Sequence, residues 1–329
     1  MTTRNGTRVI AIEEHFLDPE VKAVMAANGM RPLGPEIGRR LDDGGALHIK
    51  EMDESGIDMQ VLSHSPPGTQ WLDAATAVSM TRGVNDRLKL WVDRDPTRFA
   101  AFAALPTQEP DAAANELERC VDKLGFKGAM IYGLAAGQVF FDDKRFWPIF
   151  ERAAALDVPI YLHPAPPHPT MVDIYLKDYL ADYPTIAGPA WGFGIETATA
   201  ALRMVLSGVF DKYPNLKIIL GHLGEGIPFQ LHRMSESLSH VGAASKRPNA
   251  MTWFRDVFCD RFWITTSGNF STPALMCSMI EMGADRILYA VDWPFVMNQP
   301  GTDWIEELRI SPDDRRKLLH GNAETLLKL

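Results

Sequence analysis

Residues of the types that bind metal ions stand at the ends of four short apolar runs in this sequence. In chain order they are Glu13, Glu14 and His15, then His163, His222 and Asp292. Carboxylate and imidazole groups together bind divalent ions such as Zn²⁺ and Mn²⁺. A divalent ion held in this way can polarise a bound substrate or activate a bound water. The pattern therefore predicts a metal site with room for water or substrate.

The first of these runs, residues 9–12, leads directly into Glu13-Glu14-His15. Alternate residues of a strand share a face, so Glu13 and His15 are predicted to point to the same side and to bind one ion together. Glu14 is then expected to face the other way, toward the helices or a salt bridge. The alternation selects Glu13, rather than Glu14, as the ligand.

His163 and Asp292 follow later apolar runs, at residues 158–162 and 287–291. They can reach an ion held by Glu13 and His15 only if the strands close into a barrel. Two nitrogen and two oxygen ligands suit Zn²⁺, Mn²⁺ or a similar divalent ion, and the sequence leaves the choice of metal open.

The elements that must position these residues alternate along the chain. Strand-like runs lie near residues 9–12, 58–63, 100–105, 126–131, 158–162, 216–220, 262–267 and 286–291. Helix-like stretches include residues 73–93, 111–124, 144–156, 196–210, 226–239 and 272–282. Eightfold alternation of buried strands and helices predicts the α/β class and a closed (β/α)₈ TIM barrel, whose catalytic groups gather at the carboxyl ends of the strands. We expect a single domain over residues 1–329.

Two stretches fit this alternation poorly. Residues 26–43 are rich in glycine and proline, and residues 163–189 contain many prolines. Long irregular segments within compact domains are usually lids or subunit contacts. We therefore expect irregular insertions in the barrel, and the second stretch is a candidate contact between subunits.

Composition excludes several classes of function. The chain has 329 residues, of which 46% are hydrophobic, and a formal net charge of −9. A net negative charge without a basic stripe argues against nucleic acid as a partner. No apolar stretch approaches the length of a membrane span and no signal peptide is visible, so we expect no membrane partner and a cytoplasmic location. The three scattered cysteines, Cys120, Cys259 and Cys277, are predicted to be reduced thiols.

Several motifs together resemble a known family. They are Glu13-Glu14-His15-Phe16, Leu162-His163-Pro164, the segment from Gly221 to Pro228, the segment from Ile264 to Phe270, and Asp292-Trp293-Pro294-Phe295. This ordered set is similar to the decarboxylase branch of the amidohydrolase superfamily, which includes γ-resorcylate, 2,3-dihydroxybenzoate and 5-carboxyvanillate decarboxylases and aminocarboxymuconate semialdehyde decarboxylase. The resemblance runs from about residue 9 to the C-terminus.

The resemblance implies an amidohydrolase-type barrel with one divalent metal ion held by Glu13, His15, His163 and Asp292. The metal is commonly Mn²⁺ or Mg²⁺ in the dihydroxybenzoate members and Zn²⁺ elsewhere, with no organic cofactor. At the end of the fourth predicted strand, where binuclear amidohydrolases carry a bridging lysine or glutamate, this chain has Met130-Ile131-Tyr132-Gly133. This difference favours one metal ion rather than two.

The same resemblance implies that His222, Asp292 and Arg233 transfer protons or bind substrate. His222 is expected to be catalytic without binding the metal, and Asp292 and His222 are expected to handle the proton. Glu225 is predicted either to orient His222 or Arg233 or to cap its own helix. Arg233 is the candidate for binding a substrate carboxylate or phenolate.

These roles match the chemistry of decarboxylation. Non-oxidative loss of CO₂ from an aromatic acid requires protonation of the ring carbon that bears the carboxylate, and an ortho-hydroxyl group supplies electron density to that carbon. We assign the acid to Asp292, supported by His222, and expect the two groups to titrate as a pair. The predicted enzyme is a carboxy-lyase acting on an ortho-hydroxylated aromatic acid, reversible in principle as a phenol carboxylase.

Four other residues are candidates for the substrate pocket. His64 ends the second predicted strand and either lines the pocket or caps the strand. Trp191 and Phe295 are aromatic residues that can enclose a flat ring. Tyr132 stands where γ-resorcylate and dihydroxybenzoate decarboxylases typically carry asparagine, which suggests a bulkier or differently substituted phenolic acid as the substrate.

Two other functions remain open from the sequence. A lactone or ester hydrolase, or a hydratase, would use the same scaffold with a water at the open metal position. A binding protein without catalytic activity is the third alternative. By analogy with the family, we expect a homodimer or homotetramer.

Overall fold

The eight predicted strands are all present and alternate with helices. The computed structural model describes residues 6–30, 33–43, 45–135, 137–240, 246 and 253–329. The strands are β1 (Ile10–Phe16), β2 (Met59–His64), β3 (Phe99–Ala101), β4 (Ala129–Tyr132), β5 (Pro159–His163), β6 (Lys217–Leu220), β7 (Phe262–Thr265) and β8 (Ile287–Leu288). Nearly every strand residue is buried, as expected for a parallel sheet covered on both faces.

The predicted helices are confirmed with small shifts of their ends. They correspond to α4 (Ala74–Arg94), α5 (Pro110–Leu124), α6 (Trp147–Leu156), α8 (Gly192–Ser207), α10 (Ile227–Ser239) and α12 (Thr272–Met282). The structure adds α1 (Pro19–Ala27), α2 (Pro35–Leu41), α3 (Ala46–Ser55), α7 (Pro169–Tyr175), α9 (Val209–Lys212), α11 (Trp253–Arg261), α13 (Asn298–Glu307), α14 (Pro312–Arg316) and α15 (Asn322–Leu327). Short 3₁₀ segments precede α6 and follow α7.

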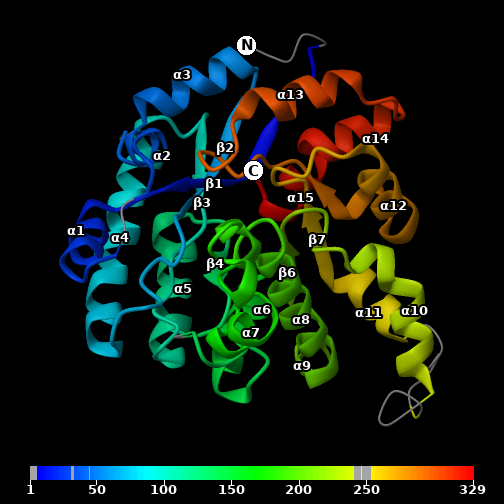
Figure 1. The fold of residues 1–329 in the computed structure, drawn as a ribbon. Coiled ribbons are helices and arrows are strands. Elements are labelled where there is room, and N and C mark those ends of the chain that lie inside the picture. Colours follow the sequence, from blue (N-terminus) through cyan, green and yellow to red (C-terminus); the bar gives the residue numbers. More distant parts are fainter. Residues whose placement is uncertain (1–5, 31–32, 44, 136, 241–245, 247–252) are drawn as a thin grey trace.

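Parallel pairing and two connecting bridges close the strands into a barrel. Strands β1–β3 form one sheet in chain order and β4–β8 form another. A parallel bridge between Ala103 and Ala129 joins the two sheets after β3, and another between Glu14 and Trp293 joins β1 to the segment after β8. The helices lie outside the strands (Figure 1). The fold is therefore the predicted (β/α)₈ barrel.

A bulge in β1 decides which residues of that strand face the barrel interior. Ile10 and Ile12 belong to the interior core cluster together with Val61 of β2. The register between β1 and β2 shifts between Ala11 and Glu14. An extra residue at a bulge reverses the alternation beyond it. Because of this shift the residues at positions 13 and 15, rather than 14, continue on the interior side.

The two segments that fit the alternation poorly are the connections that follow β1 and β5. The first contains α2, and the second contains α7 and the 3₁₀ segments Lys177–Tyr179 and Pro184–Ala187. In the part of the chain that the structure describes, no helix is long and apolar enough to cross a membrane. The three cysteines are free thiols on α5, α11 and α12, as predicted.

Candidate metal centre

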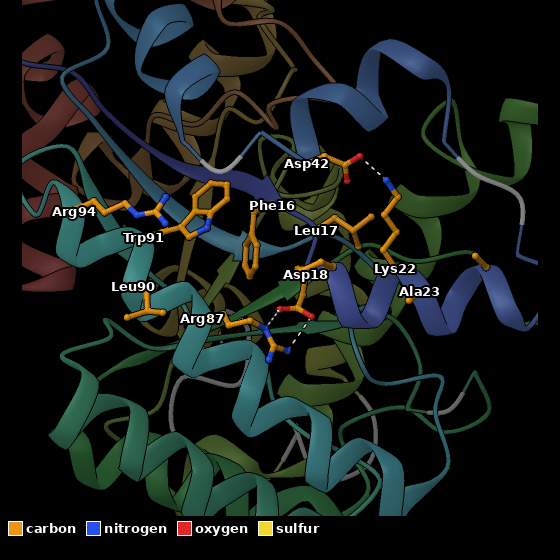
Figure 2. A pocket seen from close by; sticks show the side chains of 12 residues that line it. Phe16, Leu17, Asp18, Lys22, Ala23, Asp42, Arg87, Leu90, Trp91 and Arg94 are labelled. Carbon is orange, nitrogen blue, oxygen red and sulfur yellow. Dashed lines mark hydrogen bonds and ion pairs between the residues drawn. The ribbon is translucent and has the colours of Figure 1, made fainter.

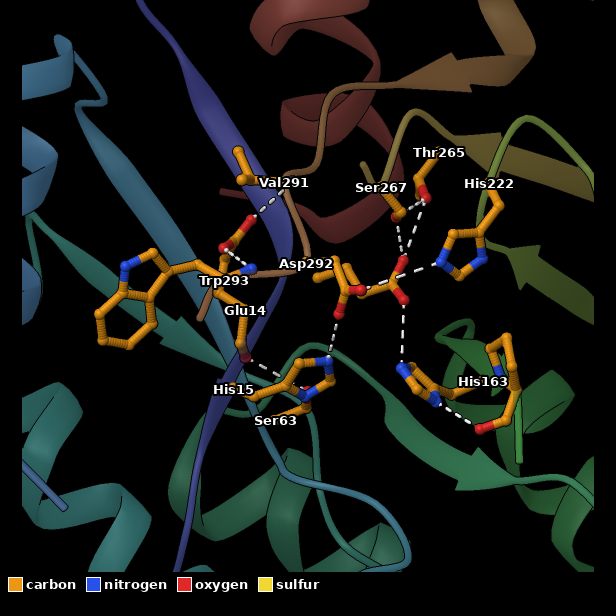
Figure 3. Close-up of polar contacts among 12 residues, drawn as sticks. Glu14, His15, Ser63, His163, His222, Thr265, Ser267, Val291, Asp292 and Trp293 are labelled. Atoms are coloured by element: carbon orange, nitrogen blue, oxygen red, sulfur yellow. Dashed lines mark hydrogen bonds and ion pairs between the residues drawn. The ribbon is translucent and has the colours of Figure 1, made fainter. Parts of the chain in front are cut away.

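Four side chains at the carboxyl ends of three elements of the barrel converge on one point. Glu13 and His15 extend from β1, His163 from β5, and Asp292 from the segment after β8. One ligand atom from each lies within 4.8 Å of the others, and all but Asp292 are fully buried. Figure 3 shows His15, His163 and Asp292 pointing toward one another. The structure thus brings together the four predicted metal ligands.

The contact between Glu13 and His163 indicates that a cation fits between them. Nδ1 of His163 lies 2.7 Å from the carbonyl oxygen of Pro164, which can only accept, so Nδ1 carries a proton and, in the neutral imidazole that binds a metal, Nε2 has the lone pair. Nε2 lies 3.2 Å from Oε1 of Glu13, and each of these two buried atoms lacks a hydrogen-bond partner among the described residues. Two facing lone pairs without a proton between them repel, whereas both can bind one metal ion.

The other oxygen of Glu13 is occupied by hydroxyl groups. Oε2 accepts hydrogen bonds from Tyr161, Ser267 and Thr265, the last at 3.2 Å. Burial raises the pKa of Glu13, but the interactions of its carboxylate with nearby imidazoles, among them the charged His222, outweigh burial and lower the pKa overall. The carboxylate is therefore ionised, with Oε1 left to bind a metal.

Sequence reasoning missed these three hydroxyl residues. Tyr161 precedes His163 by two positions and so lies on the same face of β5. Thr265 and Ser267 lie at the carboxyl end of β7, the same end of the barrel at which the metal ligands lie. Strand alternation was the available signal.

His15 is oriented by a neighbouring hydroxyl group. Oγ of Ser63 lies 3.1 Å from Nδ1 of His15 and 3.3 Å from the carbonyl oxygen of Glu14. Since Ser63 donates to that carbonyl, Nδ1 of His15 is the group that donates to Ser63. Nε2, which is 3.1 Å from Oδ1 of Asp292, is then the free ligand nitrogen. A hydrogen bond to the second ring nitrogen fixes the tautomer of a metal-binding histidine.

His222 lies beside the cluster without belonging to it. Its Nδ1 is 2.8 Å from Oε1 of Glu225, and its Nε2 is 4.0 Å from Oδ2 of Asp292. Burial opposes charge on the imidazole, but the carboxylates of Glu225 and Asp292 outweigh burial and raise its pKa well above the ordinary value. The structure thus places His222 between Glu225 and Asp292, while its role as a proton donor stays a prediction.

Backbone strain concentrates at this end of the barrel. Five of the non-glycine residues with positive φ follow β6, β7 and β8: His222 (50°), Leu223 (57°), Glu225 (54°), Ser267 (29°) and Asp292 (74°). Such conformations are unfavourable for residues with a Cβ and persist where the surrounding structure enforces them, often at functional sites. Both residues of the proposed proton pair are among the five.

Glu14 departs from its prediction in one respect. It faces away from the metal ligands, as expected, but it forms no salt bridge with any described residue. Its fully buried carboxylate accepts hydrogen bonds from the backbone N–H groups of Val291 and Trp293, at 2.9 and 3.0 Å. The outward position is therefore as expected, but the partners differ, because the closed barrel supplies backbone donors from the segment after β8.

The predicted substrate residues divide into two groups. Phe295 and Tyr132 lie at the cluster, since their rings are 5.5 Å from those of His15 and His163, respectively. His64 is buried with both ring nitrogens engaged: Nδ1 is 2.7 Å from the carbonyl of Ser65, and Nε2 accepts from the N–H of Asp18. Both ring nitrogens of His64 are therefore unavailable to a substrate.

Trp191 and Arg233 are not brought to the cluster. Trp191 is 57% exposed at the start of α8, and Arg233 is exposed on α10. Among the described residues, the hydrogen-bond partners of the four metal ligands do not include either of them. Their roles in binding substrate stay predictions.

A separate cavity of about 640 Å³ lies outside the barrel, between α1 and α4. Its walls are largely apolar and include Leu90 and Trp91, as Figure 2 shows. Four of its five charged lining residues pair with one another, Arg87 with Asp18 at 2.6 Å and Lys22 with Asp42. None of the predicted site residues lines this cavity, so it is distinct from the metal centre.

Comparison with known proteins supports the same kind of site. A model of the family described as Amidohydrolase matches residues 14–329. The gamma-resorcylate decarboxylase of Polaromonas sp. (strain JS666) is 44% identical over 328 residues, 97% of this chain and 98% of that protein. A crystal structure of a dihydroxybenzoic acid decarboxylase from Polaromonas sp. JS666, with bound manganese and the inhibitor 2-nitroresorcinol, has a TM-score of 0.89 at 43% identity and covers 98% of this chain and 97% of its own. A crystal structure of 5-carboxyvanillate decarboxylase from Sphingomonas paucimobilis has a TM-score of 0.89 at 33% identity and covers 98% of this chain and 99% of its own.

Proposed function

This chain belongs to the amidohydrolase family, and we propose that its metal centre removes CO₂ from a benzoic acid with a hydroxyl group ortho to the carboxylate. It is a metal-dependent aromatic acid decarboxylase, a carbon-carbon lyase. The observation that carries the proposal is the pair of partnerless ligand atoms in Glu13 and His163, next to the proton-holding pair Asp292 and His222. The alternatives of a lactone hydrolase and a hydratase gain no support from these relatives.

We assign the metal to Glu13, His15, His163 and Asp292, and we propose Mn²⁺ because the similar Polaromonas structure contains manganese. Two imidazole nitrogens and two carboxylate oxygens suit Mn²⁺ and Zn²⁺. When bound, such an ion would supply positive charge that stabilises the negative charge of the substrate's carboxylate and phenolate.

Asp292 and His222 handle the proton in the proposed mechanism. Asp292 transfers a proton to the ring carbon that bears the carboxylate, which forms a C–H bond and interrupts aromaticity. The C–C bond to the carboxylate then breaks, its electrons return to the ring, and CO₂ leaves. His222, whose raised pKa keeps it protonated, returns a proton to Asp292 across the 4.0 Å that separates them. Glu225 holds the imidazole in position through its 2.8 Å contact with Nδ1.

The aromatic side chains beside the cluster suit a flat substrate. Phe295 stands edge-on to His15, and Tyr132 stands edge-on to His163. The hydroxyl group of Tyr132 donates to the backbone carbonyl of His64, so the tyrosine offers its ring rather than a polar group to the site. This arrangement favours a substrate whose ring carries an apolar edge on that side.

The direct test compares two isomers of dihydroxybenzoate. The protein, loaded with Mn²⁺, is incubated with 2,6-dihydroxybenzoate or with 3,5-dihydroxybenzoate, which lacks an ortho-hydroxyl group, and CO₂ release is measured. We expect no release from the 3,5-isomer, and release from 2,6-dihydroxybenzoate or from another ortho-hydroxylated acid that better suits the ring of Tyr132. A panel with 5-carboxyvanillate and 2-hydroxybenzoate then ranks the ring substituents. No release from any ortho-hydroxylated acid, or equal release from both isomers, would contradict the proposal.

We also propose a homodimer or homotetramer in the cytoplasm. The segment predicted as a subunit contact exposes several large side chains: Ile174, Tyr175, Tyr179 and Tyr183, with Trp191 just beyond it. Clusters of exposed aromatic residues are typical of protein interfaces. The three free cysteines agree with a reducing compartment. Light scattering that gives the mass of a monomer at micromolar concentration would exclude the oligomer.

A further inference from the structure

The second glutamate of the Glu13-Glu14-His15 motif contacts the loop that carries the fourth metal ligand. Its Oε1 atom accepts from the N–H of Val291 at 2.9 Å, and its Oε2 atom accepts from the N–H of Trp293 at 3.0 Å. These two residues flank Asp292 in the chain. Figure 3 shows the carboxylate of Glu14 beside Val291 and Trp293, on the side of β1 away from the histidines.

Backbone bonds from the same strand complete this attachment. The N–H of Asp292 donates to the carbonyl of Glu13 at 2.9 Å, and the N–H of His15 donates to the carbonyl of Trp293 at 2.7 Å. Three successive N–H groups, at residues 291, 292 and 293, are therefore all bonded to residues 13 and 14. The segment that presents Asp292 is fixed directly to the segment that presents Glu13 and His15.

The conformation of Asp292 explains why such an attachment is needed. Its φ of 74° is left-handed, which is unfavourable for a residue with a Cβ. A strained residue keeps this conformation only where its neighbours are held from outside. A carboxylate is suited to this task because both of its oxygens accept and neither donates, so it can bind two N–H groups that point toward it.

We propose that Glu14 is a positioning residue that sets the place of Asp292 in the metal centre. In this assignment the outer residues of the Glu-Glu-His triplet bind the metal, and the middle residue holds the loop with the fourth ligand. The inference rests on the proposed metal site, but not on the identity of the substrate or the reaction.

The test measures Mn²⁺ affinity directly, by titration of chelator-stripped protein followed by electron paramagnetic resonance. Glu14→Gln keeps the shape of the side chain but turns one acceptor into an NH₂ group that faces a backbone N–H. We expect its Mn²⁺ affinity to fall about 10- to 100-fold, the usual effect of losing a group that orients a metal ligand. An affinity equal to that of the wild-type protein would overturn the proposal.

Glu51→Gln is the matched control. Glu51 is also a carboxylate bonded to Trp293, but it accepts from the indole Nε1, at 2.7 Å, rather than from the backbone beside Asp292. We expect its Mn²⁺ affinity to stay within about threefold of wild type. If Glu51→Gln weakens Mn²⁺ binding as much as Glu14→Gln does, any disturbance near Trp293 lowers the affinity and the proposal is wrong.

A double-mutant cycle separates positioning from a general structural role. If Glu14 acts through Asp292, the double variant Glu14→Gln, Asp292→Asn should bind Mn²⁺ no more weakly than Asp292→Asn alone. If the double variant instead shows the product of the two single losses of Mn²⁺ affinity, the proposal is overturned. Should Glu14→Gln fail to fold, Glu14→Asp serves in its place, because it keeps both oxygens on a side chain shorter by one methylene. Its affinity is expected to fall measurably, and an unchanged affinity counts against the proposal. Because no turnover is measured, a wrong substrate assignment leaves these results intact.

Discussion

Nε2 of His163 lies 3.2 Å from Oε1 of Glu13, and neither atom has a hydrogen-bond partner among the described residues. The other polar atom of each side chain is engaged, with the carbonyl of Pro164 for the histidine and with three hydroxyl groups for the glutamate. Buried polar atoms are rarely left without a partner. A shared metal ion explains why these two are.

Replacement of His163 tests this relationship. His163→Ala removes one of four ligands and should lower the metal content well below one ion per chain, measured by mass spectrometry after purification without chelator. His232→Ala is a suitable control, because the side chain of His232 is largely exposed on α10. Metal retained by His163→Ala at the wild-type level would contradict the ligand assignment.

Replacement of His222 should lower turnover without lowering the metal content, unlike replacement of His163. His222→Asn removes the proton donor but leaves the four ligands in place. We expect an unchanged metal content and a fall in kcat of about 10²- to 10⁴-fold, the usual contribution of general acid-base catalysis. If kcat stays within threefold of wild type, His222 has no part in proton transfer.

The sequence predicts the ligands well because strand ends are local features. Apolar runs that end in His163 or Asp292 are visible in the chain, and the parallel barrel follows from their alternation with helices. The bulge in β1 cannot be seen in the sequence. If the alternation continued from Ile12, Glu14 would face the barrel interior; the register shift in the pairing with β2 places Glu13 and His15 there instead. The contact of Glu14 with the N–H groups beside Asp292 depends on ring closure, so it could not be predicted from neighbouring residues.

Phe295 should affect the binding of an aromatic substrate rather than the metal. Phe295→Ala removes a ring that lies 5.5 Å from that of His15. Loss of one aromatic contact costs about 0.5–1.5 kcal/mol, so kcat/KM should fall about 2- to 12-fold, mainly through KM, with metal content unchanged. Phe229→Ala is the control, since Phe229 is 80% exposed on α10. An unchanged KM in Phe295→Ala would remove Phe295 from the pocket.

His64 should make the folded state sensitive to acid. Burial lowers the pKa of His64 to about 4, and its Nε2 must stay unprotonated to accept from the N–H of Asp18. An unfolded histidine titrates near pH 6.5, so between about pH 6.5 and pH 4 the unfolded chain binds the extra proton and stability falls as the pH falls. The slope from one such group is at most about 1.4 kcal/mol per pH unit.

The measurement is urea unfolding of metal-free protein at pH 7.5, 6.5 and 5.5. His64→Gln lacks the titrating group, so its free energy of unfolding should fall less between pH 6.5 and 5.5 than that of the wild-type protein. Part of the dependence should persist, because burial also lowers the pKa of His48, to about 3. His232→Gln, which alters an exposed histidine, should keep the full wild-type slope. Parallel slopes in wild type and His64→Gln would mean that His64 is not the group whose protonation opposes folding.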